Sequence, residues 1–142
     1  MNRETEKAKT LLESGEPTLV LCSKTKTITS AERGVKTLLA FVKEKKNLKG
    51  FSAADKVVGK GAAALFCLLG IKELYTPLIS EGARGLLEEN GIEVFFDEEV
   101  RNIINRKGDG ICPVESALGE ERELSKCLEI IEATVLRLSG TA

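Results

Sequence analysis

The chain has 142 residues, of which 42% are hydrophobic and 30% are charged, and its 21 basic and 22 acidic side chains leave a net charge of −1. This length and apolar content suit one domain over residues 1–142, and the near-neutral charge argues against a dedicated nucleic-acid-binding protein. No apolar run approaches the roughly 20 residues that cross a bilayer, and the charged N-terminus does not resemble a secretory signal. We therefore expect a cytoplasmic protein without a membrane partner.

The first fifty residues predict a helix, a β-hairpin and a second helix. Apolar residues recur at helical spacing over 3–14, and this segment ends at a glycine with a proline just beyond. TLVLCS (18–23) is a compact apolar strand, and the alternating segment KTKTITS (24–30) can pair back onto it. Ser30 then opens a second helix, whose apolar face runs to Val42.

The middle of the chain predicts alternating helices and strands. SAAD, at the start of residues 52–70, is a capping box that opens a helix of small residues. A strand follows over 74–79, a helix over 80–91 and a strand over 92–96. Together with the hairpin, this alternation predicts an α/β fold: a three-layer α/β/α sandwich with a mixed sheet of four or five strands.

The last third of the chain contains RKGDGICPVESALG, which begins at Arg106. If a helix starts here, Cys112 is its N-cap, Pro113 takes the first position, where proline is favoured, and Glu115 completes half of a capping box. An amphipathic helix follows over 121–138, and its expected inward face carries Leu124, Leu128, Ile131, Val135 and Leu138.

The residue types that are missing also limit the function. The chain contains no histidine and no glutamine. Without histidine, the usual Ser-His-Asp and Cys-His catalytic arrangements and histidine metal sites are excluded. The lack of glutamine beside many lysines and glutamates hints at a thermophile.

Four cysteines are scattered without a Cys-x-x-Cys pair, so we expect free thiols. Cys22, Cys67 and Cys127 lie in apolar segments and predict buried thiols, whereas Cys112 lies among glycines and polar residues. A thiol at a helix start near basic residues tends to become more nucleophilic, although Glu115 acts against this. Cys112 is therefore the candidate catalytic residue, with a buried structural thiol as the alternative.

Three segments carry a resemblance to a known family: VVGKGAAALFCLLG, SEGARGLLEENGIEVFF and NRKGDGICPVESAL. With the order of elements, they make nearly the whole chain resemble a small family of bacterial proteins of unknown function that has a cytidine-deaminase-like fold. The zinc motif of active deaminases fails here. Ser80 and Ala83 stand where its two cysteines belong, and neither a histidine ligand nor the general-acid glutamate lies near Gly59–Gly61. The resemblance therefore implies no zinc deaminase, no metal site and no cofactor.

The resemblance also implies a pocket where two helix starts converge beside the sheet. Helix starts carry unpaired N–H groups and partial positive charge, which suits a phosphate. We expect a nucleotide-like, phosphate-bearing ligand. The candidate binding residues are Asp55, Lys56, Gly59, Lys60, Gly61, Ser80, Glu81, Arg106 and Glu115. As alternatives, the glycines allow close packing and the lysines are solvated; the GKG sequence lacks the spacing of a Walker loop.

Three functions stay open at this point. The first is a nucleotide-binding sensor or regulator without zinc. The second is a metal-independent enzyme that acts on a nucleotide derivative through Cys112 or a lysine. The third is a structural or partner-binding protein, in which apolar faces could support a homo-oligomer.

Overall fold

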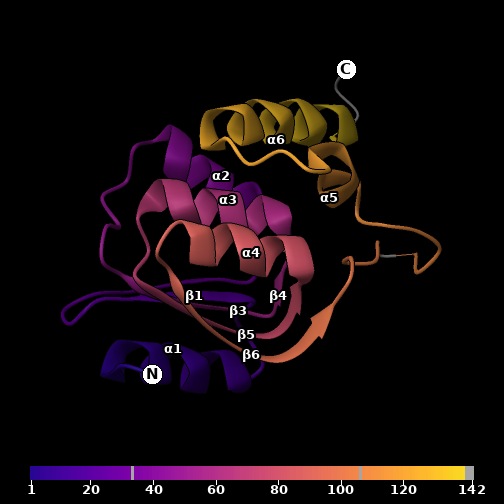
Figure 1. The fold of residues 1–142 in the computed structure, drawn as a ribbon. Helices are drawn as coiled ribbons and strands as arrows, with labels where there is room; N and C mark the ends of the chain where they lie inside the picture. The colour runs from indigo at the N-terminus through magenta and orange to yellow at the C-terminus, as the bar shows by residue number, and fades with distance from the viewer. Residues whose placement is uncertain (33, 106, 140–142) are drawn as a thin grey trace.

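A computed structural model describes residues 1–32, 34–105 and 107–139 (Figure 1). The strands in this part of the chain are β1 Leu19–Cys22, β2 Thr27–Ser30, β3 Ser52–Asp55, β4 Val57–Val58, β5 Glu73–Ser80 and β6 Glu93–Val100. The helices are α1 Arg3–Glu13, α2 Lys36–Lys43, α3 Lys60–Leu69, α4 Glu81–Glu89, α5 Pro113–Leu118 and α6 Leu124–Leu138. The predicted α/β class is confirmed. In the described residues, no helix is long and apolar enough to cross a membrane.

The strands form one mixed sheet. β1 is antiparallel to β2 and to β3, whereas β3, β5 and β6 run parallel in that order. β4 continues β3 along β5 in an unchanged register. Between them, Lys56 falls opposite Pro77, which has no N–H to donate, so the ladder is interrupted there. This interruption explains why the described residues form six strands where four or five were predicted.

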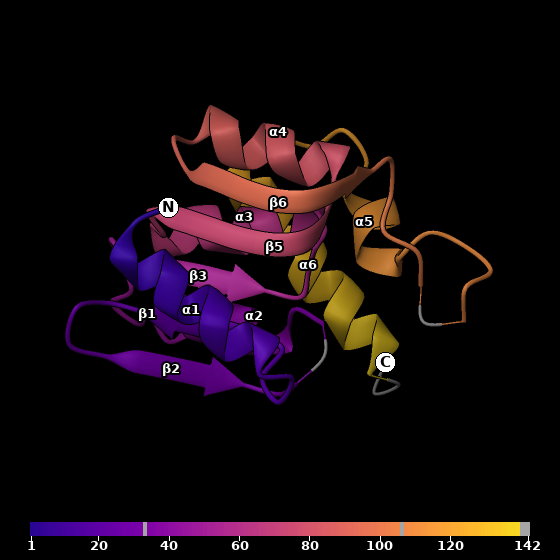
Figure 2. The same ribbon diagram turned by 90° about the horizontal axis from the view of Figure 1, so that it is seen from below.

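Helices cover both faces of the sheet (Figure 2). α1 lies on one face and α2, α3 and α4 lie on the other, while α5 and α6 pack beyond α3 (Figure 1). The side chains of β1 show why both faces are covered, because they alternate between two apolar clusters on opposite sides of the sheet. Leu19 and Leu21 belong to the core that contains α3, whereas Val20 and Cys22 pack with α1. α3 is thus enclosed between the sheet and α6, which accounts for its small, buried residues over 62–64.

The predicted helix over residues 52–70 is wrong in its first half. Ser52 lies in β3, where it pairs with Cys22 on one side and Glu73 on the other. Pairing with two neighbouring strands decides the conformation of this segment, against its local capping pattern. α3 begins only at Lys60, near the end of the segment 55–61 that was predicted to bind the ligand.

Two smaller predictions also change. Ser30 closes the hairpin opposite Leu19, so α2 begins at Lys36 instead. Leu138 was expected on the inward face of the last helix, but it is exposed near the end of α6. The three-layer sandwich of the cytidine-deaminase type stays a prediction.

Candidate functional site

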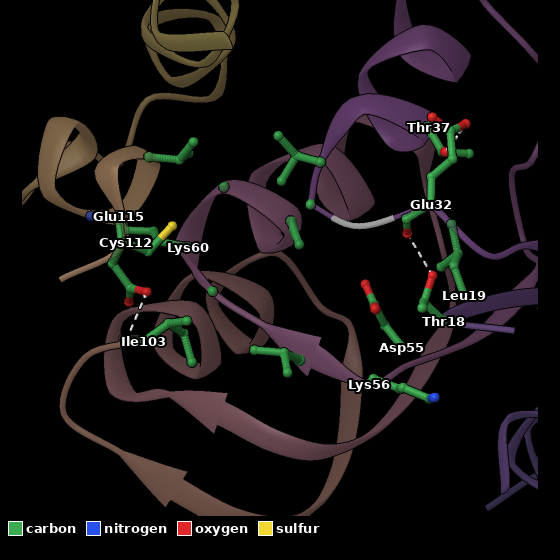
Figure 3. A pocket seen from close by; sticks show the side chains of 17 residues that line it. Thr18, Leu19, Glu32, Thr37, Asp55, Lys56, Lys60, Ile103, Cys112 and Glu115 are labelled. Atoms are coloured by element: carbon green, nitrogen blue, oxygen red, sulfur yellow. Dashed lines mark hydrogen bonds between the residues drawn. The ribbon is translucent and has the colours of Figure 1, made fainter. Parts of the chain in front are cut away.

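A cavity of about 430 Å³ opens beside the carboxyl end of β3, where α3 begins (Figure 3). Ligands often bind at this edge in open α/β sheets. The predicted site residues that line it are Asp55, Lys56, Gly59, Lys60, Gly61, Cys112 and Glu115. The other lining residues are Thr18, Leu19, Glu32, Gly34, Val35, Thr37, Val57, Ala62, Ile103 and Val114. Two candidate segments that lie far apart in the sequence therefore face one cavity.

The labelled side chains gather at two ends of the cavity (Figure 3). One end holds the thiol and a carboxyl, with Lys60, Ile103, Cys112 and Glu115. The other end is richer in hydroxyl and charged groups, with Thr18, Leu19, Glu32, Thr37, Asp55 and Lys56. A ligand that fills the cavity would meet different chemistry at its two ends.

Two glycines at the start of α3 let α5 pack against it. A Cβ added to Gly61 would lie 2.5 Å from Cγ1 of Val114, and one added to Gly59 would lie 2.9 Å from Oε2 of Glu115. Side chains of α5 thus fill the space beside both glycines, which is the packing alternative for these residues. The first turn of α3 still forms part of the cavity wall, and Gly59 has no side chain to cap its amides.

Glu115 is 7% exposed and lies between α5 and the start of α3. Its Oε2 accepts a hydrogen bond from the Ile103 N–H at 3.1 Å, and the Ser80 hydroxyl also interacts with the carboxyl. Burial raises the pKa of Glu115, while these two hydrogen bonds and the Lys60 ammonium act in the opposite direction. The predicted capping box is wrong, because the Cys112 N–H donates to the carbonyl of Ile103 at 2.8 Å.

Asp55 ends β3, and its carboxyl points toward the middle of the cavity (Figure 3). Burial raises the pKa of Asp55 to about 7, although hydrogen bonds from the backbone amides of Val57 and Lys56 act to lower it. Near neutral pH, this carboxyl exists in both the protonated and the ionised form. It can therefore donate as well as accept hydrogen bonds, depending on the pH.

The ammonium groups of both lysines in the predicted phosphate site donate hydrogen bonds to backbone carbonyls. Lys60 is 6% exposed, and its Nζ donates to the Gly119 carbonyl at 2.6 Å. Lys56 is exposed, and its Nζ donates to the Gly15 carbonyl at 3.2 Å. An exposed hydrogen bond of this kind contributes about 1 kcal/mol or less, so Lys56 can turn back to the cavity mouth at little cost. The Lys60 bond links the start of α3 to the end of α5.

The remaining predicted residues lie elsewhere. Ser80 is buried, and its hydroxyl caps α4 by accepting the Ala83 N–H at 3.3 Å. Glu81 is exposed in the first turn of α4 and does not line the cavity. Arg106 lies outside the described residues. The start of α4 contacts two lining residues of the cavity: Ser80 interacts with Glu115, and a Cβ added to Gly82 would lie 3.5 Å from Cδ of Lys60.

Cys112 is the thiol that lines the cavity. It is half-buried and precedes α5 as the N-cap, with Pro113 at the first helical position, as predicted. Cys22 and Cys127 are fully buried, as expected. Cys67 is only half-buried, and burial raises its pKa to about 12, which disfavours the reactive thiolate.

Comparison with known proteins places this chain in a family. A family model described as a domain of unknown function, DUF1893, matches residues 7–135. The chain belongs to the DUF1893 family. The crystal structure of a DUF1893 family protein from Thermotoga maritima is similar to it, with a TM-score of 0.84, 24% sequence identity, and coverage of 94% of this chain and 91% of that chain. At this identity the likeness concerns the fold, and no curated protein matches the chain.

At the polar end of the cavity in this DUF1893 domain, the sequence pointed to Asp55 and Lys56 but not to Thr18, Glu32 and Thr37. Thr18 Oγ1 donates to the Glu32 carbonyl at 2.6 Å, and Thr37 Oγ1 donates to Oε1 of Glu32 at 3.0 Å. Thr18 precedes the hairpin, and Glu32 and Thr37 follow it. The Thr18 carbonyl accepts the Lys56 N–H at 3.0 Å, which brings this group to the end of β3 and so to the cavity. The pairing of β1 with β3 creates this proximity, and no local motif marks it.

Among the described residues of the DUF1893 domain, no group of three or more cysteine, aspartate or glutamate side chains is placed to hold a metal ion. The start of α4, where the resemblance to deaminases would place two cysteines, carries Ser80 and Ala83. Here the Ser80 hydroxyl caps the helix.

Proposed function

We propose that this DUF1893 domain binds a nucleotide-like small molecule in its cavity and acts as a sensor or regulator. The observation that carries the proposal is a single cavity of about 430 Å³ lined by the hairpin, the start of α3 and the segment around Cys112. Small-molecule sites usually measure about 300–1,000 Å³ and combine apolar walls with a few polar groups.

The charges suggest how a nucleotide would be oriented. Asp55 and Glu115 at the wall would repel a phosphate inside the cavity, whereas Lys56 is exposed at its edge. We therefore propose that the base and sugar lie inside and that the phosphate stays at the mouth. There, the Lys56 ammonium would leave the Gly15 carbonyl and pair with the phosphate.

The wider setting is part of the same proposal. We propose a three-layer, cytidine-deaminase-like architecture in a bacterial, cytoplasmic protein that has lost the zinc site. Ser80 and Ala83, which stand in place of the motif's cysteines, support the loss of the metal. The helices on both faces of the mixed sheet support the layered architecture.

Thermal unfolding with a panel of nucleosides, nucleotides, dinucleotides and sugar nucleotides tests the binding. A true ligand at 100 times its Kd adds about 2.7 kcal/mol, which corresponds to a rise in Tm of roughly 10 °C for a domain of this size. Lys56→Gln should weaken nucleotide binding while leaving nucleoside binding unchanged. The exposed Lys7 of α1 provides the matched control, as Lys7→Gln. If no member of the panel raises Tm, the proposal is wrong.

A second candidate function is favoured by one observation, namely that Cys112 lines the same cavity. A metal-independent enzyme could use this thiol on a nucleotide derivative. We expect iodoacetamide to modify Cys112 first, because Cys22 and Cys127 are buried and the raised pKa of Cys67 disfavours its thiolate.

The rate of this modification, followed by mass spectrometry, separates catalysis from simple accessibility. A catalytic thiol should react faster than free cysteine at the same pH, and Cys112→Ser should abolish the fast phase. A Cys112 rate at or below that of free cysteine removes the case for an enzyme.

A further inference from the structure

The basic and the acidic side chains of the cavity place their charged groups differently. The described lysines that line it, Lys56 and Lys60, hold their ammonium groups on backbone carbonyls outside it. The carboxyl-bearing residues Glu32, Asp55 and Glu115 belong to its wall. The interior thus offers hydrogen-bond acceptors and apolar surface, which suits a ligand that brings donors.

Two of these three carboxyls already accept hydrogen bonds from neighbouring groups. Glu115 accepts the Ile103 N–H at 3.1 Å, and Glu32 accepts the Thr37 hydroxyl at 3.0 Å. Asp55 differs, because the groups that act on its carboxyl are the backbone amides of Val57 and Lys56, the second of which also donates to the Thr18 carbonyl at 3.0 Å. The carboxyl points toward the middle of the cavity (Figure 3). A carboxylate has about four acceptor positions, so two amides leave room for further donors.

We propose that Asp55 is the residue that selects the ligand, by accepting hydrogen bonds from an amino or amidine group at the ligand's inward end. This inference rests on the proposed function, since it names the group that enters the same cavity. A ring carbonyl of the ligand at this position would place its lone pairs against those of the Asp55 carboxylate. A buried acceptor would then be left without a hydrogen-bond donor. Sites built on such a hydrogen bond reject the mismatched analogue strongly.

Matched pairs of ligands test the selection. Adenosine and inosine differ by an amino group against a carbonyl, as do cytidine and uridine, and each pair can be used as nucleosides or as 5′-monophosphates. Isothermal titration at pH 8.5, where Asp55 is mostly ionised, should show the amino member binding at least about 10-fold more tightly.

Variants assign this preference to a residue. Asp55→Asn should reduce it to less than about 3-fold, because an amide can turn to donate or to accept. Asp55→Ala serves as the second variant and should remove the preference together with part of the affinity. The exposed Glu98 of β6 supplies the control, and Glu98→Gln should bind like the unmodified protein.

The outcomes separate this inference from the function on which it rests. Equal binding within the pairs, or tighter binding of the carbonyl members, overturns the selection and leaves the binding function standing. A preference that survives in both Asp55 variants also overturns it, since another group would then be responsible. The absence of binding by every member of the panel overturns the proposed function itself.

Discussion

Asp55→Asn is expected to make the ligand-free protein more stable at pH 8. Burial raises the pKa of Asp55 from 3.8 to about 7, so the folded state holds a proton that the unfolded state has already lost between these values. The stability linked to this proton is complete below pH 3.8 and disappears as the pH rises to 7, at up to about 1.4 kcal/mol per pH unit. Asparagine keeps a similar shape without the ionisation.

Urea unfolding at several pH values measures this effect. The difference in the free energy of unfolding between Asp55→Asn and the unmodified protein should grow from pH 4 to pH 7 and then level off. Glu115, whose pKa is also raised by burial, is present in both proteins and cancels in this difference. Parallel pH profiles for the two proteins would show that Asp55 is not destabilised by burial.

Gly61→Ala is expected to destabilise the protein, whereas Gly85→Ala on α4 is expected to stabilise it. A Cβ at Gly61 would meet Cγ1 of Val114 at 2.5 Å, while a Cβ at Gly85 has nothing within 4 Å among the described residues. Overpacking of a tight contact costs about 1–3 kcal/mol. An alanine in an open helical position gains up to about 1 kcal/mol over glycine.

A double variant, Gly61→Ala with Val114→Ala, tests whether contact with α5 causes the destabilisation by Gly61→Ala. Val114→Ala removes the methyl group that an alanine at position 61 would meet, so Gly61→Ala should cost less in that background. The three variants and their combination can be compared by thermal or urea unfolding. Additive effects of the two substitutions would contradict a direct contact between α3 and α5.

The sequence predicted the elements that have strong local patterns. The hairpin of β1 and β2, the start of α4 at Ser80 and the start of α5 after Cys112 all follow from alternation or from capping chemistry. It also predicted seven residues of the cavity wall, mainly because the family resemblance directed attention to them.

The errors have a common physical origin. The segment from Ser52 reads locally as a helix start, yet it pairs with strands on both sides and becomes β3. Glu115 reads as part of a capping box, yet its carboxyl bonds Ile103 from a different segment. Thr18 and Thr37 carry no motif at all. Each of these outcomes depends on contacts between distant segments, which periodicity and capping rules do not contain.

The position of Ile103, Cys112 and Glu115 in the cavity wall has a consequence for folding. These residues and Val114 belong to the last third of the chain, whereas the rest of the wall comes from residues 18–62. The cavity is therefore completed only when the late segment docks against α3, and contacts so distant in sequence form slowly. A ligand that bridges both parts would hold this segment in place. It would thereby slow hydrogen exchange at the Cys112 amide, which bonds the Ile103 carbonyl.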